Sequence, residues 1–267
     1  MFLSKALKNA ISSKQYHKSI INVRRFYKCT PICFQEPDSD YVQNLQWFLE
    51  KARRQDKAVE TSEEYHQQQD LYSQYAQNYD EMYAKTEYQD ALLIYQKAQE
   101  WYQGNKNISI LDYGCGSGRI ASSFAFRGYG HIDGSEPNET FLESAEKTYI
   151  FRNLYQVGSF DDHSVIKQKH YDLLISSGCF FISQSHPGYD VFPTLTQLVR
   201  KNGYITICTA ERYMRFPHVR NGKVKEMERQ GKIEILPTMT FPNFREANEW
   251  EEDEDMHGII LNFKVIE

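Results

Sequence analysis

The pattern of hydrophobic and polar positions divides the chain into a polar first part and a later part with regular elements. From residue 108 onward, short apolar runs alternate with segments in which apolar residues recur three or four positions apart. The runs predict strands and the spaced segments predict helices. The expected strands cover residues 108–113, 131–135, 154–157, 171–176, 204–209, 233–239 and 258–265. The expected helices cover residues 119–126, 139–147, 189–200 and 224–229.

This alternation predicts the fold class. Strands that alternate with helices form βαβ units, which build a mostly parallel sheet in an α/β protein. The last two strands have no helix between them, so we expect an antiparallel pair. The first of the two should run parallel to the rest of the sheet and the last should run against it.

The residues before the sheet form two further segments. Residues 1–35 contain no acidic side chain, and basic residues are spread along them with apolar residues at helical spacing near the start. This composition is typical of a mitochondrial transit peptide and places the protein in the mitochondrial matrix; the alternative is the basic tail of a cytoplasmic protein. Residues 36–69 read as a polar linker with a loosely attached helix, and residues 70–267 as the main domain.

Composition excludes several classes of function. The formal net charge is -5, so no global basic field attracts nucleic acid. No apolar run approaches the roughly 20 residues of a membrane-spanning helix. The five cysteines are scattered, which indicates reduced thiols rather than disulfides or a zinc site. We therefore expect no metal, no nucleic acid and no membrane span.

The sequence from Leu111 to Arg119 carries the main chemical signal. It follows an apolar strand, opens a helix, and contains Gly114, Cys115, Gly116 and Gly118. Glycines at these positions permit a tight turn and let backbone N–H groups approach a ligand, as in dinucleotide-binding turns.

Two ligands compete for such a turn. A nicotinamide site needs its third glycine one place later, where this chain has Arg119. Asp112 instead suits a ligand with an ammonium group, such as the methionine part of S-adenosylmethionine. Asp133 follows 19 residues after Gly114, at the end of the second expected strand, where an acid can accept both ribose hydroxyls.

At these residues the chain resembles the class I S-adenosylmethionine-dependent methyltransferases, and within them the Williams–Beuren-region methyltransferase-like proteins. The resemblance covers roughly Tyr72 to the C-terminus. It rests on the segments 75–80, 111–118, 133–135, 176–178 and 198–204. It implies a Rossmann-like seven-stranded sheet, mostly parallel with an antiparallel last strand and helices on both faces. It also implies S-adenosyl-L-methionine as the cofactor and a poorly defined methyl acceptor.

Further candidate residues follow the other strands or precede the sheet. Gly134, Ser135 and Phe160 are expected to border the cofactor, and Ser176 to face its sulfonium. The evenly spaced tyrosines at 72, 75, 79 and 83 share a helical face. They either pack that helix onto the sheet, or Tyr75 or Tyr79 covers the cofactor with an aromatic face.

The acceptor side offers weaker signals. His186 is a candidate general base, although a loop histidine bonded to backbone is the alternative, and Tyr79 is a second catalytic candidate. No Asn-Pro-Pro-aromatic sequence follows the fourth strand, which disfavours nucleic-acid bases and glutamine as acceptors. Acidic residues gather around Trp250, between residues 246 and 255, and either keep a loop solvated or attract a cationic acceptor.

Three functions are compatible with these observations. The first is a methyltransferase acting on a small molecule or a protein side chain. The second is a cofactor-binding assembly or scaffold factor without turnover. The third is a nicotinamide-dependent reductase, against which Asp112 and Arg119 argue.

Overall fold

The computed structural model describes residues 72–73, 89–158, 161–180, 189–211, 214, 222–242 and 257–267. The chain divides into two units, Met1–Asn44 and Leu45–Glu267, and all described residues lie in the second. The predicted leader (1–35) and linker (36–69) lie outside the described residues and stay predictions. No helix in the described part of the chain is both long and apolar enough to cross a membrane.

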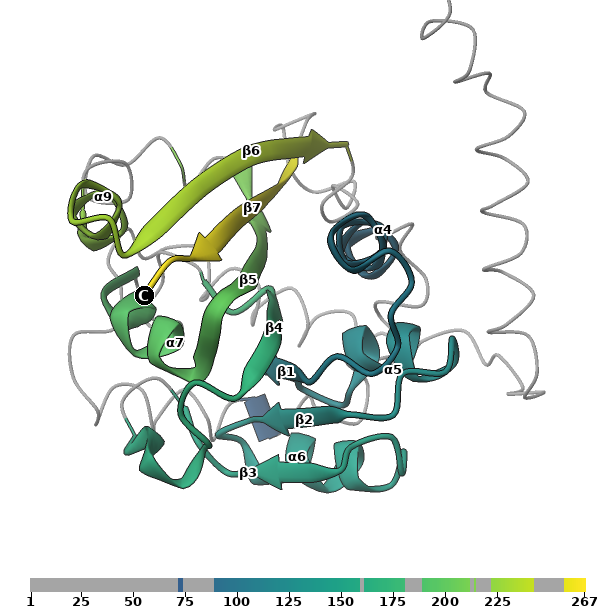
Figure 1. Cartoon of the computed structure of the whole chain (residues 1–267). Helices are drawn as coiled ribbons and strands as arrows, with labels where there is room; N and C mark the ends of the chain where they lie inside the picture. The colour runs from purple at the N-terminus through teal and green to yellow at the C-terminus, as the bar shows by residue number, and fades with distance from the viewer. Residues whose placement is uncertain are drawn as a thin grey trace, which may run out of the picture. The chain divides into compact units, whose positions relative to one another are not determined.

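The described residues form a seven-stranded sheet with the strand order β3-β2-β1-β4-β5-β7-β6 (Figure 1). This confirms the predicted α/β class and the Rossmann-like arrangement. β1 lies inside the sheet, with β2 and β3 on one side of it and the later strands on the other, so the chain winds outward in both directions from β1. The strands are β1 (Ile110–Tyr113), β2 (Ile132–Ser135), β3 (Asn153–Tyr155), β4 (Tyr171–Ser177), β5 (Val199–Ala210), β6 (Ile233–Phe241) and β7 (Gly258–Val265).

One strand runs against the others. The pairs β1–β2, β1–β4, β2–β3 and β4–β5 are parallel, whereas β7 pairs antiparallel with both β5 and β6. β6 therefore runs in the same direction as β5. Both expectations for the last two strands are confirmed.

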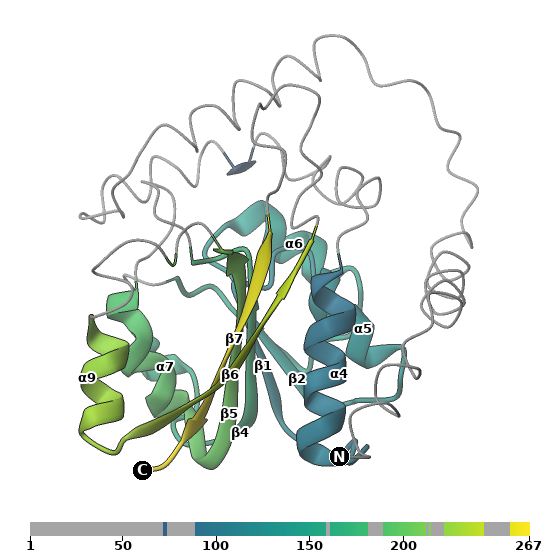
Figure 2. The ribbon, with the colours of Figure 1, turned by 90° about the horizontal axis from the view of Figure 1, so that it is seen from above.

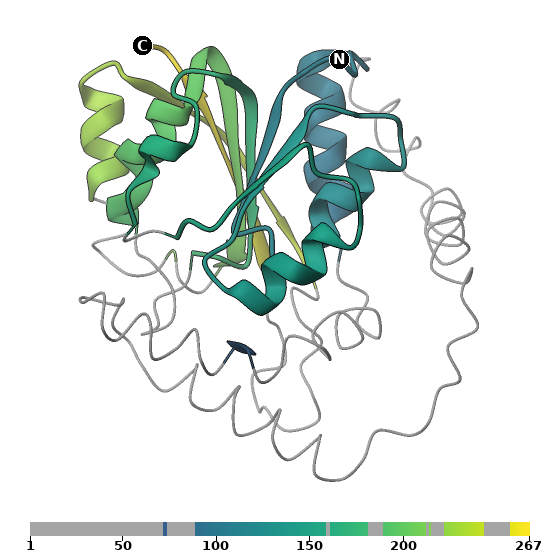
Figure 3. The same ribbon diagram turned by 90° about the horizontal axis from the view of Figure 1, so that it is seen from below.

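Helices cover both faces of the sheet, as predicted (Figure 2; Figure 3). On one face, α4 (Asp90–Tyr102) and α5 (Arg119–Ala125) contribute Ile94, Ala121 and Phe124 to one core cluster. On the other face, α7 (Phe192–Leu198) and α9 (Lys223–Arg229) contribute to a second cluster. The α6 helix (Glu139–Glu146) follows β2, and 3-10 turns occupy His163–Val165 (η1) and Tyr189–Val191 (η2).

The predicted helix over residues 189–200 is shorter in the structure. It begins as η2, continues as α7, and ends at Leu198, because Val199 already pairs with Tyr171 as the first residue of β5. The expected turn at Asn202–Gly203 appears as an irregularity within β5, where Asn202 has a φ of 64° and the register to β4 shifts. Local pairing with β4 therefore overrides the helical spacing of residues 199–200.

The tyrosine series is represented by its first member. The rings of Tyr72 and Phe141 of α6 are 6.4 Å apart, and Asn138, which caps α6, donates a hydrogen bond from Nδ2 to Ser73 Oγ at 2.8 Å. Tyr72 thus packs on α6, which agrees with the packing interpretation for that residue. Tyr75, Tyr79 and Tyr83 lie outside the described residues.

Candidate cofactor site

The glycine turn after β1 has the backbone that its sequence requires. Gly114, Gly116 and Gly118 have φ angles of 69°, 54° and 95°, in the left-handed region that residues with a Cβ rarely adopt. A Cβ built on Gly114 would overlap Cys179 Sγ, whereas one built on Gly116 would meet no atom of the described residues within 4 Å. The Cys179 side chain therefore packs against the turn at Gly114, and the turn has space for a ligand beside Gly116.

Asp112 provides a buried acceptor at the carboxyl end of β1. Its side chain is fully buried, and Oδ2 accepts a hydrogen bond from Ala121 N of α5 at 3.1 Å. Oδ1 has no hydrogen-bond partner among the described residues. Burial raises the pKa of Asp112 to about 7. A buried oxygen without a partner costs free energy, so this position is suited to a ligand that brings a donor or a positive charge.

A second buried carboxylate, Glu136, lies directly after the end of β2. Its Oε2 accepts from Gly116 N at 3.0 Å and its Oε1 accepts from Asn138 N at 3.0 Å. Burial raises the pKa of Glu136 to about 7 as well. Glu136 was not among the residues predicted from the sequence to bind the cofactor. The available signal was its place immediately after the strand and two residues before Asn138, which caps the next helix.

Asp133 has a different environment from the one expected of a ribose ligand. Its buried carboxylate accepts four hydrogen bonds: Arg152 Nε (3.0 Å) and Asn153 Nδ2 (3.0 Å) to Oδ1, and Arg152 Nη2 (2.9 Å) and Tyr171 hydroxyl (2.8 Å) to Oδ2. Burial would raise the pKa of Asp133, but the hydrogen bonds from Arg152, Tyr171 and Asn153 outweigh it and hold the pKa below its usual value.

The geometry therefore does not fit the expectation that Asp133 accepts ribose hydroxyls, because four donors already fill the acceptor positions of its carboxylate, whereas Glu136 accepts only two from the described residues. Its side chain lies on the sheet face opposite to Asp112: it is in register with Leu111, whereas Asp112 is in register with Gly134. The acid that stands at the end of β2, beside the glycine turn, is Glu136.

Of the other predicted residues in the described part of the chain, Ser176 and Gly134 support the packing around the turn, and Ser135 has a hydroxyl without a hydrogen-bond partner among the described residues. Ser176 is buried and donates from Oγ to Tyr113 O at 2.7 Å, which joins β4 to β1. Gly134 is a packing position, since a Cβ there would lie 2.9 Å from Cys115 Sγ and 2.8 Å from Phe151. Ser135 is buried with its Oγ unpaired. Phe160 and His186, like Tyr75 and Tyr79, lie outside the described residues.

A buried tyrosine and histidine join the end of β1 to the segment after β3. The Tyr113 hydroxyl lies 3.1 Å from His163 Nε2, and His163 Nδ1 lies 2.9 Å from Asp161 O. The two rings are stacked with centroids 5.9 Å apart. Burial lowers the pKa of His163, which favours the neutral ring. An Nδ1–H that donates to Asp161 O leaves Nε2 to accept from Tyr113, so both groups are satisfied within the fold.

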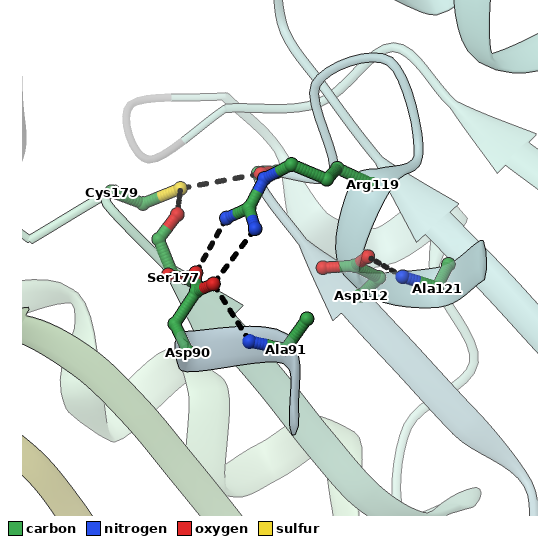
Figure 4. A network of polar contacts seen from close by, with 8 residues as sticks. Asp90, Ala91, Asp112, Arg119, Ala121, Ser177 and Cys179 are labelled. Carbon is green, nitrogen blue, oxygen red and sulfur yellow. Dashed lines mark hydrogen bonds and ion pairs between the residues drawn. The ribbon is translucent and has the colours of Figure 1, made fainter. Parts of the chain in front are cut away.

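A further buried acid, Asp90, lies at the start of α4 (Figure 4). The Arg119 guanidinium donates to it with both terminal nitrogens, Nη1 to Oδ1 at 2.7 Å and Nη2 to Oδ2 at 2.5 Å. Ala91 N donates to Oδ1 at 2.7 Å, and Ser177 Oγ donates to Oδ2. The cluster thereby joins α4, the residue after the glycine turn and the end of β4.

These groups form a site for an organic cation with hydroxyl donors. Two buried carboxylates, Asp112 and Glu136, flank a turn that is open at Gly116. No group of three or more His, Cys, Asp or Glu side chains in the described ranges is placed to hold a metal ion.

Comparisons with known proteins agree with this geometry. Residues 110–203 match the family model described as "Methyltransferase domain". No curated protein matches the chain. The resemblance to the Williams–Beuren-region proteins therefore stays a prediction.

Solved structures share the fold at low sequence identity. A structure from Listeria monocytogenes described as a class I S-adenosylmethionine-dependent methyltransferase is 14% identical, with a TM-score of 0.51 over 66% of this chain and 59% of that chain. A TehB-like S-adenosylmethionine-dependent methyltransferase from Corynebacterium glutamicum is 18% identical, with a TM-score of 0.49 over 74% of this chain and 100% of that chain. Residues 110–203 thus match a methyltransferase domain model, and the sheet that contains them has the same fold as the class I S-adenosylmethionine-dependent methyltransferase structure from Listeria monocytogenes.

Proposed function

We propose that this protein is an S-adenosylmethionine-dependent methyltransferase that acts on a small molecule or a protein side chain. The observation that carries the proposal is the buried, unpaired Oδ1 of Asp112 at the edge of a glycine turn with open space at Gly116. A buried carboxylate oxygen without a partner is costly in the ligand-free protein and favourable once a cationic ligand covers it.

Different side chains of the protein bind different parts of the cofactor. Asp112 accepts the ammonium group of the cofactor, and Glu136 accepts the ribose hydroxyls, the role expected of Asp133. The backbone of Gly114 to Gly118 lies against the ligand between these two acids. Glu136 also accepts Gly116 N, so the same carboxylate fixes the turn and binds the sugar.

The bound cofactor supplies a methyl group already activated on a sulfonium. The protein's contribution is therefore to align the donor with the acceptor and to exclude water. Two anions around a cationic ligand also favour the charged cofactor over its neutral product. This distribution of roles is compatible with the absence of an acid–base dyad beside the turn among the described residues.

The proposal extends to three features outside the described residues. The acidic segment around Trp250 favours a cationic acceptor such as an amine, a guanidine or a basic peptide. His186 is the candidate base for an acceptor that must lose a proton. The basic leader favours import into the mitochondrial matrix, which N-terminal sequencing of the endogenous protein would test.

Calorimetry and a turnover assay test the function in two steps. The full chain should bind S-adenosylmethionine and S-adenosylhomocysteine, and show no binding of NADH. Incubation with methyl-labelled cofactor and a fractionated extract should then transfer label to an acceptor. Binding without transfer in any fraction would favour the assembly-factor alternative, and failure to bind either cofactor form would overturn the proposal.

A further inference from the structure

We propose that Asp90 is a positioning residue that holds the Arg119 guanidinium away from Asp112, and so keeps Asp112 Oδ1 open for the ammonium group of the cofactor. The inference rests on the proposed function. It concerns a residue that lies 22 positions before Asp112, outside the segment matched by the family model.

The first observation is the placement of the two acids around one arginine. Arg119 directly follows Gly118, the last glycine of the turn, and Asp90 reaches it from the start of α4. In Figure 4 the oxygen of Asp112 that is not bonded to Ala121 points toward the Asp90–Arg119 pair. Asp112 accepts Ala121 N, two residues after Arg119 in the first turn of α5, so both side chains lie at the start of this helix. Arg119 also lowers the pKa of Asp112, although burial raises it more.

The second observation is that Asp90 binds the guanidinium in a fixed orientation. Its carboxylate is fully buried and accepts four donors, two of them from Arg119 in the paired geometry that fixes both planes. Ala91 N and Ser177 Oγ fix the carboxylate itself from two other elements. The arginine is thus held at one acid although a second, unsatisfied acid lies beside it.

Without Asp90, the Arg119 guanidinium would compete with the cofactor's ammonium group for Asp112. The Arg119 side chain is 22% exposed and sits on a long flexible stem, so loss of Asp90 releases a cation next to an unpaired buried carboxylate. The released guanidinium would turn to Asp112 and occupy the acceptor that the cofactor's ammonium requires. Asp90 therefore acts on the cofactor through Arg119 and touches no part of it.

The chain offers a closely matched control. Asp133 is a second fully buried carboxylate that accepts four donors, two of them from Arg152, and it lies on the opposite face of the sheet. Breaking either pair leaves one unpaired charge in the fold. Only Asp90 releases an arginine beside Asp112.

The experiment compares Asp90→Asn, Asp133→Asn and the double variant Asp90→Asn/Arg119→Met in the full chain. Calorimetric dissociation constants are measured for S-adenosylmethionine and for 5′-methylthioadenosine, which lacks the ammonium group, and thermal unfolding is followed in parallel. Asp90→Asn should weaken S-adenosylmethionine about tenfold or more and change 5′-methylthioadenosine by less than about threefold. Asp133→Asn should lower the unfolding temperature and leave both dissociation constants near the wild-type values.

The double variant separates positioning from simple structural support. Removing the competing guanidinium should restore most of the affinity that Asp90→Asn loses, whereas a structural role predicts equal or weaker binding. If Asp90→Asn does not fold, Asp90→Ser and the double variant carry the same comparison. Wild-type affinity in Asp90→Asn, or absence of rescue in the double variant, overturns the inference. Failure of the wild-type protein to bind cofactor overturns the proposed function itself.

Discussion

The two acids at the ends of β1 and β2, Asp112 and Glu136, contrast with the two acids that lie earlier in their strands, Asp133 and Asp172. Asp133 and Asp172 are paired with Arg152 and Arg200, and Asp172 also accepts Ser109 N at 2.7 Å. Among the described residues no cation forms an ion pair with Asp112 or Glu136, and burial raises the pKa of both to about 7. All four side chains are nearly or fully buried.

Burial therefore does not distinguish a structural acid from a binding acid in this protein, whereas pairing does. A buried carboxylate with an arginine partner is already compensated, and adding a ligand gains nothing there. A buried carboxylate held by one or two backbone N–H groups still has free acceptor capacity. The following variants test this distinction from the largest expected effect to the smallest.

Asp133→Asn should reduce the free energy of unfolding by about 3–5 kcal/mol, because it removes two charge-assisted hydrogen bonds from Arg152 and points an amide N–H group at donors in a buried site. Denaturant titration of the ligand-free protein measures this loss. The dissociation constant for S-adenosylhomocysteine should stay unchanged in the folded variant. A large loss of cofactor affinity without loss of stability would instead return Asp133 to the ribose site.

Asp112→Asn should weaken the binding of S-adenosylmethionine by about 3 kcal/mol, or more than 100-fold, because a buried charge–charge contact is lost. The amide oxygen can still accept Ala121 N, and the unpaired charge is gone, so the unfolding temperature should not fall. Calorimetry and thermal unfolding on the same preparation check both parts. Destabilisation with normal affinity would make Asp112 a structural acid.

Glu136→Gln should weaken S-adenosylhomocysteine by about 2 kcal/mol, since the neutral amide provides a poorer acceptor for two hydroxyl groups. The matched ligand is the 2′-deoxyribose analogue of the cofactor product. It should bind the wild-type protein less tightly and should lose much less affinity on the substitution. An equal loss for both ligands would place Glu136 away from the 2′-hydroxyl.

The effect of pH per group should be smaller than that of any of these substitutions, and its sign follows from the raised pKa values. Burial raises the pKa of Asp112 and Glu136 to about 7, so the folded ligand-free protein keeps protons that the unfolded chain releases near pH 4. Between about pH 4 and pH 7 these two groups make the ligand-free protein less stable as the pH rises. A cationic cofactor needs the ionised acids, so its affinity should rise about tenfold per group from pH 6 to pH 8.

Calorimetry in buffers of different ionisation enthalpy measures the protons released on binding. Wild-type protein should release protons near pH 6.5 to about the extent that these acids are protonated, and Asp112→Asn should release fewer. Binding that is independent of pH over this range would mean that both acids are already ionised in the ligand-free protein.

Much of the fold could be predicted from the sequence because the strands of this sheet are short apolar runs. The glycine turn sits between β1 and α5 as expected, and the predicted helix 119–126 is observed as Arg119–Ala125. The exception, the end of the helix at Leu198, depends on the pairing of Val199 with Tyr171. A contact between residues so far apart in the sequence is invisible to local periodicity.

The parts of the site that depend on backbone geometry could be predicted from the sequence. The parts that depend on the direction of a side chain could not. The turn needs positive φ angles, which predict glycine at positions 114, 116 and 118. Asp112 lies two residues before the first of these glycines in the sequence. The choice between Asp133 and Glu136 depends on which face of β2 a side chain occupies and on where the strand ends. The four donors around Asp133 come from Arg152 and Asn153, just before and at the start of β3, and from Tyr171, at the start of β4, so only the assembled sheet reveals that this acid is occupied.

The aromatic stack at the far end of α4 makes this helix an optical reporter. Trp101 lies parallel to Tyr204 of β5, with centroids 4.4 Å apart and an angle of 5° between the rings. Asp90 begins the same helix, so the indole senses whether α4 is docked on the sheet without lying near the cofactor. Replacing the two other tryptophans, Trp47 and Trp250, would leave Trp101 as the single tryptophan. Its emission would separate detachment of the helix from loss of ligand in every variant described above.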